Sequence, residues 1–287
     1  MKVLEQQVET LVSPNQHFII RLDGVAFNTF TKGIQKPFDE RLTLAMIETT
    51  KDLVSKFNAV SGYHQSDEIS LVFPAADLPL IEDVHETKKQ KRMVERCHIY
   101  GGRIQKLASV TSSYASSRLN YYLSKYDWQD VAESVRKRML GHEAYFDGRV
   151  IPTNDPKMIA ECIFWRSNCD GLRNAISHIA QIHFKQSELN GKSLSVQIQM
   201  LKDEKNVDIF DSYSNRILFG TWVKKEQYEV VGMLHPKTGL PLPNKVFRSR
   251  IRVGSFNWAN WQESQRVEFI MEKLWQDSPM SPPKDPL

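Results

Sequence analysis

Short apolar segments of two kinds alternate along the first half of this chain, and their order restricts the folds that it can adopt. Strand-like segments rich in β-branched residues alternate with longer segments whose apolar residues recur at helical spacing. The predicted order is strand, helix, strand, strand, helix, strand: residues 17–22, 39–57, 59–65, 68–73, 103–122 and 149–153. This is the order of a split βαβ sheet, the ferredoxin-like arrangement, in the α+β class. Residues 156–186 predict helical additions to it.

Two aspartates follow the ends of predicted strands. The strand HFIIRL stops at Asp23-Gly24, and Ser66-Asp67 joins the two strands of a predicted hairpin. If the first strand lies beside the hairpin in one sheet, Asp23 and Asp67 converge at one sheet edge. Magnesium binds through one or two carboxylates and leaves positions for substrate phosphates, so this pair predicts metal-dependent phosphoryl transfer. The alternative is ordinary turn chemistry, because Asp-Gly and Ser-Asp are common turn pairs.

Three residues close to these aspartates add to the predicted site. Glu68 directly follows Asp67, but alternation along a strand predicts that it points to the opposite side of the sheet. Gly24 has no side chain, so its backbone can approach a metal ion or a triphosphate closely. Asp39 stands at the start of a predicted helix, where the helix dipole favours a negative charge.

Basic residues at three places are candidates for phosphate contacts. Lys36 precedes Pro37 just ahead of the first predicted helix, and Arg103 and Lys106 lie three apart on the second, so both point from one face. The alternative is solvated surface charge, which is also the favoured interpretation of the KKQKR run at 88–92. His178 and His183 lie five apart, a spacing that does not suit two ligands on one helix face, and are interpreted as core or surface histidines.

The overall composition is that of an ordinary soluble globular protein, and the low number of cysteines fits a reducing, cytoplasmic setting. The net charge of +4 permits a polyanionic partner such as RNA without requiring one. Three cysteines make no disulfide framework, and no run of about 18 apolar residues predicts a membrane span. We expect a catalytic domain over residues 1–225, an extension packed on it over 226–276, and a disordered proline-rich tail over 277–287.

The predicted site lies within a series of motifs that resembles a known family. In order along the chain they are RLDGVAFNTFTKGIQKPFDERL, GYHQSDEISLVF, GGRIQKLASVTSSYASSRLN, YFDGRV and FWRSNCDGLRNAISHIAQ. They resemble the tRNA(His) guanylyltransferase family, polymerases that add nucleotides in the 3′-to-5′ direction, over about residues 15–225. RNAIS…AQ and NGKS are similar to the bacterial and phage-like branch, which is associated with template-dependent repair of tRNAs truncated at the 5′ end.

The resemblance implies a polymerase palm and a role for individual residues. Asp23 and Asp67, with the Gly24 carbonyl, match the ligands of two Mg²⁺ ions, and Glu68 matches the acidic residue beside them. The residues implied to contact nucleotide are Gly24, Lys36, Asp39, Ser66, Arg103, Lys106 and Asn174. Relatives are generally tetrameric, so a homotetramer is expected as well.

Some positions depart from the family's pattern. Val25 stands where a basic residue is frequent, Asn28 where histidine is common, and Tyr63-His64 replaces the frequent Tyr-Gly pair. Gly171 occupies the histidine position of the motif tied to histidine tRNA in the eukaryotic enzyme. These departures leave the RNA substrate open.

The family chemistry runs in two stages. The 5′-monophosphate of tRNA first attacks the α-phosphate of ATP or GTP, and the 3′-hydroxyl of an incoming nucleotide then displaces the AMP or GMP. Both are phosphoryl transfers, which depend on positioning and charge neutralisation. Two alternatives remain at this point: a palm-domain nucleotide cyclase, which needs no RNA, and an RNA-binding protein that has lost catalysis.

Overall fold

The predicted split βαβ sheet forms the centre of the molecule. The structure, a computed structural model, describes residues 8–76, 97–230, 232 and 246–275. A six-stranded sheet has the order β4-β1-β3-β2-β5-β6, and each pair of neighbouring strands is antiparallel. The strands are β1 (His17–Gly24), β2 (Ser61–Gln65), β3 (Glu68–Phe73), β4 (Phe146–Thr153), β5 (Thr221–Val230) and β6 (Val246–Gly254).

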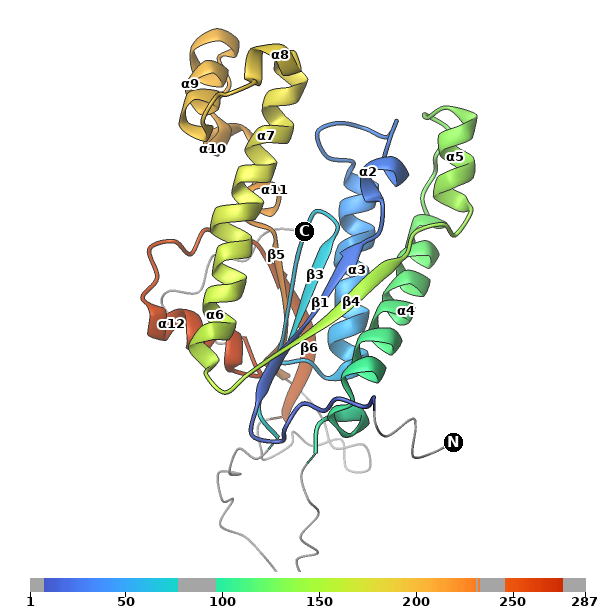
Figure 1. Ribbon diagram of the computed structural model, residues 1–287, viewed down its shortest axis with the longest axis vertical. Coiled ribbons are helices and arrows are strands. Elements are labelled where there is room, and N and C mark those ends of the chain that lie inside the picture. Colours follow the sequence, from blue (N-terminus) through green and yellow to red (C-terminus); the bar gives the residue numbers. More distant parts are fainter. Residues whose placement is uncertain (1–7, 77–96, 231, 233–245, 276–287) are drawn as a thin grey trace, which may run out of the picture.

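The first four strands and two long helices confirm the ferredoxin-like order. Helix α3 (Glu40–Phe57) joins β1 to β2, and α4 (Ile104–Leu123) precedes β4, as the apolar spacing predicted. Both helices lie on one face of the sheet, where Ile20, Leu53 and Leu119 are fully buried in a shared core (Figure 1). Because this face is buried along the whole of β1 and β3, the register of the two strands is fixed.

The opposite face of the sheet is covered by α6 (Pro156–Phe164) and α12 (Glu263–Met271) (Figure 1). An aromatic core fills this layer, including Trp222 of β5 and Trp258, both fully buried. Lys224 of β5 is also buried, and its Nζ donates to the Phe269 and Glu272 carbonyl oxygens at the end of α12. The expected boundary between residues 225 and 226 therefore falls inside β5, and the sheet continues across it. The KKQKR run and the predicted tail at 277–287 lie outside the described residues.

A helical module rises above the sheet. Helix α6 continues through a π-helical segment (Trp165–Gly171) into α7 (Leu172–His183), so the helix-rich prediction for 156–186 is confirmed (Figure 1). A separate apolar core holds α7 against the short helices that follow. They are α8 (Gln186–Leu189), α9 (Leu194–Lys205), α10 (Ile209–Ser212) and α11 (Asn215–Phe219). A π-helical turn within an α-helix often marks a functional site, and this one faces the cavity described below.

Three short elements complete the described structure. They are α2 (Phe27–Phe30), a 3₁₀ turn (Ile99–Gly102) and α5 (Glu133–Leu140). Among the described helices, none combines the length and the apolar character that a membrane crossing demands.

Candidate active site

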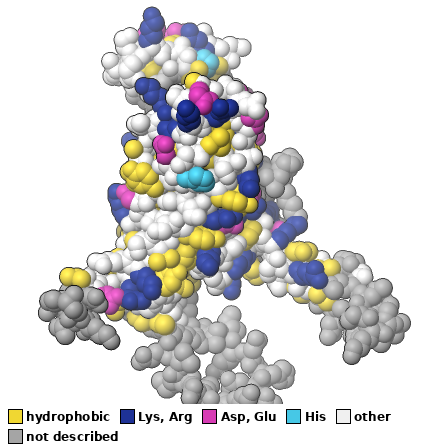
Figure 2. Space-filling view, turned by 90° about the vertical axis from the view of Figure 1, so that its right-hand side faces the viewer, with side chains coloured by type: hydrophobic (Ala, Val, Ile, Leu, Met, Phe, Trp, Pro, Cys, Tyr) yellow, Lys and Arg dark blue, Asp and Glu magenta, His cyan; other side chains and the backbone are white. Residues whose placement is uncertain are grey.

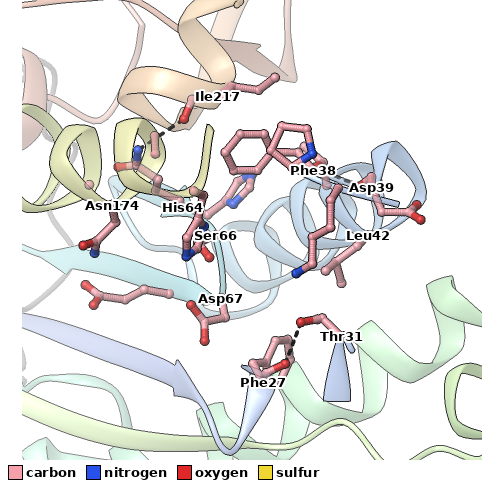
Figure 3. Close-up of a pocket in the computed structure, with 18 of the residues that line it drawn as sticks. Phe27, Thr31, Phe38, Asp39, Leu42, His64, Ser66, Asp67, Asn174 and Ile217 are labelled. Atoms are coloured by element: carbon pink, nitrogen blue, oxygen red, sulfur yellow. Dashed lines mark hydrogen bonds between the residues drawn. The ribbon is translucent and has the colours of Figure 1, made fainter. Parts of the chain in front are cut away.

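A cavity of about 660 Å³ lies between the sheet and the helical module (Figure 3). One side, which we call the palm wall, consists of lining residues between 27 and 43 and the β2–β3 hairpin, 63–68. The other side, the helical wall, consists of lining residues between 166 and 217, from the π-helical segment, α7 and α11. The volume falls in the range typical of small-molecule sites.

The two predicted metal-binding aspartates lie at the same end of the sheet. Asp23 is at the end of β1, directly across from Glu68 of β3 in the antiparallel register. Asp67 is in the tight turn before β3, and its backbone oxygen accepts a hydrogen bond from the Gly24 N–H at 3.1 Å. Ser66 takes the left-handed conformation that this turn needs, with φ of 53°. The predicted convergence therefore follows from the pairing of β1 with β3.

The pKa values of Asp67 and Glu68 are both raised. Burial raises the pKa of Asp67, and the charge of Asp23 raises it further, against a hydrogen bond with Ser66. Burial also raises the pKa of Glu68, with contributions from Asp23 and Asp67, whereas Arg166 opposes the shift. A site at which carboxylates repel one another is stabilised by a bound cation.

Glu68 turns toward the helical wall, where it is paired. Its Oε2 lies 3.2 Å from the Arg166 guanidinium, which also contacts Asp170 at 3.3 Å. Glu68 nevertheless lines the same cavity as Asp67.

The residues at this end fit a magnesium site of the kind that substrate phosphates complete. Asp23 and Asp67 supply hard oxygen ligands, and Mg²⁺ needs only one or two protein carboxylates. In the described part of the chain, no cluster of three or more His, Cys, Asp or Glu side chains forms a cage made of protein ligands alone. Gly24 is required here by packing, because a Cβ on it would lie 2.4 Å from the Phe27 ring.

The segment that carries Lys36 into the cavity is anchored by Asp39. Asp39 caps α3 and accepts hydrogen bonds from the backbone N–H groups of Gln35, at 3.2 Å, and Arg41, at 3.0 Å. The Arg41 guanidinium binds both Asp39 oxygens at 3.0 and 2.8 Å and stacks on Trp128. Burial alone would raise the pKa of Asp39, but the hydrogen bonds lower it overall. Both oxygens are thus engaged, and Asp39 lines the cavity as an anchor for the segment.

Lys36, Ser66 and Asn174 meet at the cavity as predicted, and His178 joins them. Figure 3 shows Asn174 on α7 and Asp67 on the hairpin tip, among the residues that line the cavity. Burial lowers the pKa of His178, and it is lowered further by Lys36 and raised by Asp67. Lys36, Asp67 and His178 are therefore close enough to interact electrostatically. From the sequence, His178 is interpreted as a core or surface histidine. Its spacing from His183 gives no information about its proximity to Lys36 and Asp67.

A second group of lining residues lies toward α11. His64 is 3% exposed, and neither of its ring nitrogens has a hydrogen-bond partner in the described structure. Burial lowers the pKa of His64 to about 3, and the nearby charge of Arg216 contributes. Arg216 lines the cavity from α11, and none of the described hydrogen bonds or ion pairs involves its guanidinium. No sequence motif predicted a role for Arg216, which is the only basic residue of the short helix α11.

Gly171 is required by the contact between the two walls. A Cβ on Gly171 would lie 1.8 Å from Gln65 Oε1. Gln65 is held in place, because its Oε1 accepts from the Tyr63 hydroxyl at 2.6 Å and its Nε2 donates to the Leu218 carbonyl oxygen at 3.0 Å. Gln65 therefore fills the space that a side chain at position 171 would need.

Arg103 and Lys106 lie away from this cavity. Arg103 pairs with Leu11 as an isolated β-bridge and contacts Glu9 at 3.4 Å, whereas Lys106 lies over the Tyr100 ring. They stand at the start of α4, near the beginning of β1, and Asp23 is at the other end of that strand (Figure 1). An eight-residue strand spans about 25 Å, so within one chain these two residues do not share the site. Their predicted contact with nucleotide stays a prediction.

Comparison with known proteins points to one family. Residues 1–154 match the sequence model of the family described as Thg1, tRNAHis guanylyltransferase. The chain is 30% identical over 235 residues to the uncharacterized protein R259 of Acanthamoeba polyphaga mimivirus, across 79% of this chain and 76% of the viral protein. It is 28% identical over 169 residues to the probable tRNA(His) guanylyltransferase of Drosophila melanogaster, across 58% of this chain and 48% of the fly protein.

Two solved structures share the fold over most of their length. A bacterial Thg1-like protein in complex with ATP matches with a TM-score of 0.64 and 28% identity, over 78% of this chain and 86% of that one. A bacterial Thg1-like protein in complex with GTP matches with a TM-score of 0.64 and 26% identity, over 93% of this chain and 96% of that one. The mixed fold of antiparallel sheet and helices is therefore that of the Thg1-like polymerases.

Proposed function

Because this chain belongs to the tRNAHis guanylyltransferase family, we propose that it adds nucleotides in the 3′-to-5′ direction to the 5′ end of tRNA. Members of the family are tRNA guanylyltransferases, which are nucleotidyltransferases. The finer proposal is that addition follows a template, repairs or extends the 5′ end, and depends on two Mg²⁺ ions after activation by ATP or GTP.

One observation carries this proposal. Asp23 and Asp67 lie at the same end of the sheet, near the end of β1 and just before the start of β3, and Asp67 lines the cavity together with Lys36 and Asn174. Carboxylates at one end and a cation beside them suit a nucleotide triphosphate held with metal ions. A catalytically dead RNA-binding protein would have no need for two partly buried, mutually repelling aspartates.

Each residue group has a proposed task in the reaction. Asp23, Asp67 and the Gly24 carbonyl would hold the metal ions, which would activate the attacking oxygen and stabilise the leaving one. Lys36 and Asn174 would position the phosphates, because phosphoryl transfer depends mainly on placement and charge neutralisation. Ser66 lowers the pKa of Asp67 and would help to keep it charged, and Arg166 pairs with Glu68.

The positions of Arg103 and Lys106 bear on the assembly. Since neither reaches the cavity of its own chain, they can contact a nucleotide or a 5′ phosphate there only from another copy. The homotetramer implied by the family resemblance would allow this. A cytoplasmic location is part of the same proposal, because tRNA processing takes place there.

The basic residues on one face of the molecule do not by themselves favour the RNA-binding alternative. On the face seen in Figure 2, Lys and Arg side chains are dispersed among hydrophobic and uncharged ones. A protein that only bound RNA would rely on a concentrated basic surface. The site between the walls is therefore the better guide to function.

The test uses a 5′-truncated tRNA carrying a labelled 5′-monophosphate, with Mg²⁺, ATP and each nucleotide in turn. We expect the product to lengthen at its 5′ end and the added nucleotide to follow the base opposite. Asp67→Asn should lower the rate at least about 100-fold, since it removes a metal ligand, with no loss of stability because it also removes repulsion from Asp23.

The control is Asp203→Asn, which changes an exposed aspartate on α9 outside the cavity lining and should leave the rate unchanged. Normal addition by folded Asp67→Asn would contradict the site assignment. Conversion of free nucleotide to a cyclic product without RNA would indicate the cyclase, and absence of metal-dependent nucleotide binding would indicate the inactive RNA-binding protein.

A further inference from the structure

The cavity has two chemically different ends. The end at Asp67 carries Asp67 itself, Lys36 and His178, which interact electrostatically. The end at α11 carries Ile217, Arg216 and His64, and Phe38 lies between the two ends, with its ring centroid 6.4 Å from that of His178. Figure 3 shows Ile217 and Asp67 on opposite sides of the cavity, with His64 and Phe38 between them in this view. For the inference below, a nucleotide is taken to bind with its phosphates at the Asp67 end and its base toward α11.

The α11 end suits a flat ring that carries hydrogen-bond acceptors. Phe38 supplies an aromatic surface, and Ile217 supplies an apolar one. Arg216 supplies only donors, in a fixed planar fork. No carboxylate pairs with this guanidinium in the described structure, so its donors are available to a ligand. His64 is buried there with both ring nitrogens unpaired, a polar group without a partner inside the protein.

These properties distinguish the two purines. Guanine presents two acceptors, N7 and O6, on the edge that a guanidinium contacts with two parallel hydrogen bonds. Adenine presents one acceptor and an amino donor on the same edge, and that donor would face the donors of Arg216. We propose that Arg216 contacts the base of a nucleotide that binds this cavity in the absence of RNA, and that it favours guanine over adenine there. This inference rests on the proposed function, because it assumes that the cavity binds a nucleotide.

Binding to the full-length protein without RNA tests the inference directly. Titration calorimetry in MgCl₂ would compare GTP, ATP, ITP and 7-deaza-GTP. We expect GTP to bind about tenfold or more tightly than ATP. ITP should match GTP within about threefold, because it keeps N7 and O6, and 7-deaza-GTP should bind more weakly because it lacks N7.

Two substitutions at position 216 isolate the contribution of the guanidinium. Arg216→Gln should remove most of the preference for GTP while changing ATP binding by less than about threefold. Arg216→Lys keeps the charge but loses the two-pronged contact, and should also lose the preference. Lys192→Gln is the matched control, because it removes one exposed positive charge from the same helical module outside the cavity. It should bind all four nucleotides as the wild type does.

Three outcomes would overturn the inference. They are equal binding of GTP and ATP by the wild type, retention of the preference in Arg216→Gln, and an equal loss for GTP, ATP and inorganic triphosphate, which would make Arg216 a phosphate contact. A 5′-addition assay run in parallel separates the two claims. A protein that selects guanine through Arg216 but extends no RNA contradicts only the proposed function. A protein that extends RNA with no such selectivity contradicts only the inference.

Discussion

The palm wall and the helical wall reach the same cavity by different means. The palm wall is built from residues close in sequence, and its carboxylates are positioned by the pairing of β1 with β3. The helical wall is built from α7 and α11, whose lining residues are placed by the docking of the module onto Gln65 and the hairpin. The family's sequence model covers residues 1–154 and so ends before the helical wall. A bacterial Thg1-like structure nevertheless matches over 93% of this chain, so the shared fold extends beyond the palm wall.

If the palm wall depends on local anchoring, Arg41→Met should have the largest effect on stability. Asp39 has a side chain only 1% exposed and would lose its cationic partner, at a cost of about 3 kcal/mol. Urea unfolding measures this cost. Nucleotide affinity should fall too, because Asp39 anchors the segment that carries Lys36.

The pH dependence of Arg41→Met provides a second check. The pKa of Asp39 is lowered in the folded protein, so its stabilisation is complete above the unfolded pKa and is lost as the pH falls through the folded one. The difference in unfolding free energy between the wild type and Arg41→Met should therefore become smaller below about pH 4. Lys51→Met removes an exposed partner of Glu48 on the same helix and should cost about 0.5 kcal/mol or less. If Arg41→Met lost no more unfolding free energy than Lys51→Met, the stability of the protein would not depend on the pairing of Asp39 with Arg41.

The contact between the two walls can be tested by Gly171→Ala. The added methyl group would displace Gln65, and we expect a loss of about 2 kcal/mol in unfolding free energy. Combining it with Gln65→Ala should cost less than the sum of the single changes, because the second substitution removes the contact with Gln65 and leaves only that with the Arg166 carbonyl oxygen, at 2.5 Å. Additive losses would mean that the walls are not coupled through this pair.

The smallest expected effect is a pH dependence contributed by His64, which lies in the palm wall beside Arg216 of the helical wall. Its folded pKa of about 3 is below its ordinary value of 6.5. Between these values the unfolded chain binds a proton that the folded one does not, so stability falls as the pH drops below 6.5, by at most about 1.4 kcal/mol per pH unit. Above pH 6.5 there is no such dependence.

His64→Gln should make this slope shallower by about one proton, as measured by urea unfolding at several pH values between 5 and 7.5. Some slope should remain, because the pKa values of His17 and His178 are lowered as well. An unchanged slope in the variant would show that His64 accepts a proton while the protein is folded.

Local sequence patterns were sufficient to predict the elements that form the palm wall. The β-branched run before Asp23, the Ser66-Asp67 turn and the Asp39 cap each follow from interactions within a few residues, and the order of elements then brought the two aspartates together. Family resemblance assigned Lys36 and Asn174 to nucleotide binding; both line the cavity, and their contact with a nucleotide stays a prediction.

Only the tertiary structure decided which other residues share the site. It placed His178, Arg166 and Arg216 in the cavity, more than 90 residues along the chain from the hairpin, and it placed Arg103 and Lys106 at the other end of β1. The physical reason is that the direction of a helical side chain depends on how the helix is rotated and docked on its neighbours. That docking is set by distant packing contacts, such as Gly171 against Gln65, which no local pattern encodes.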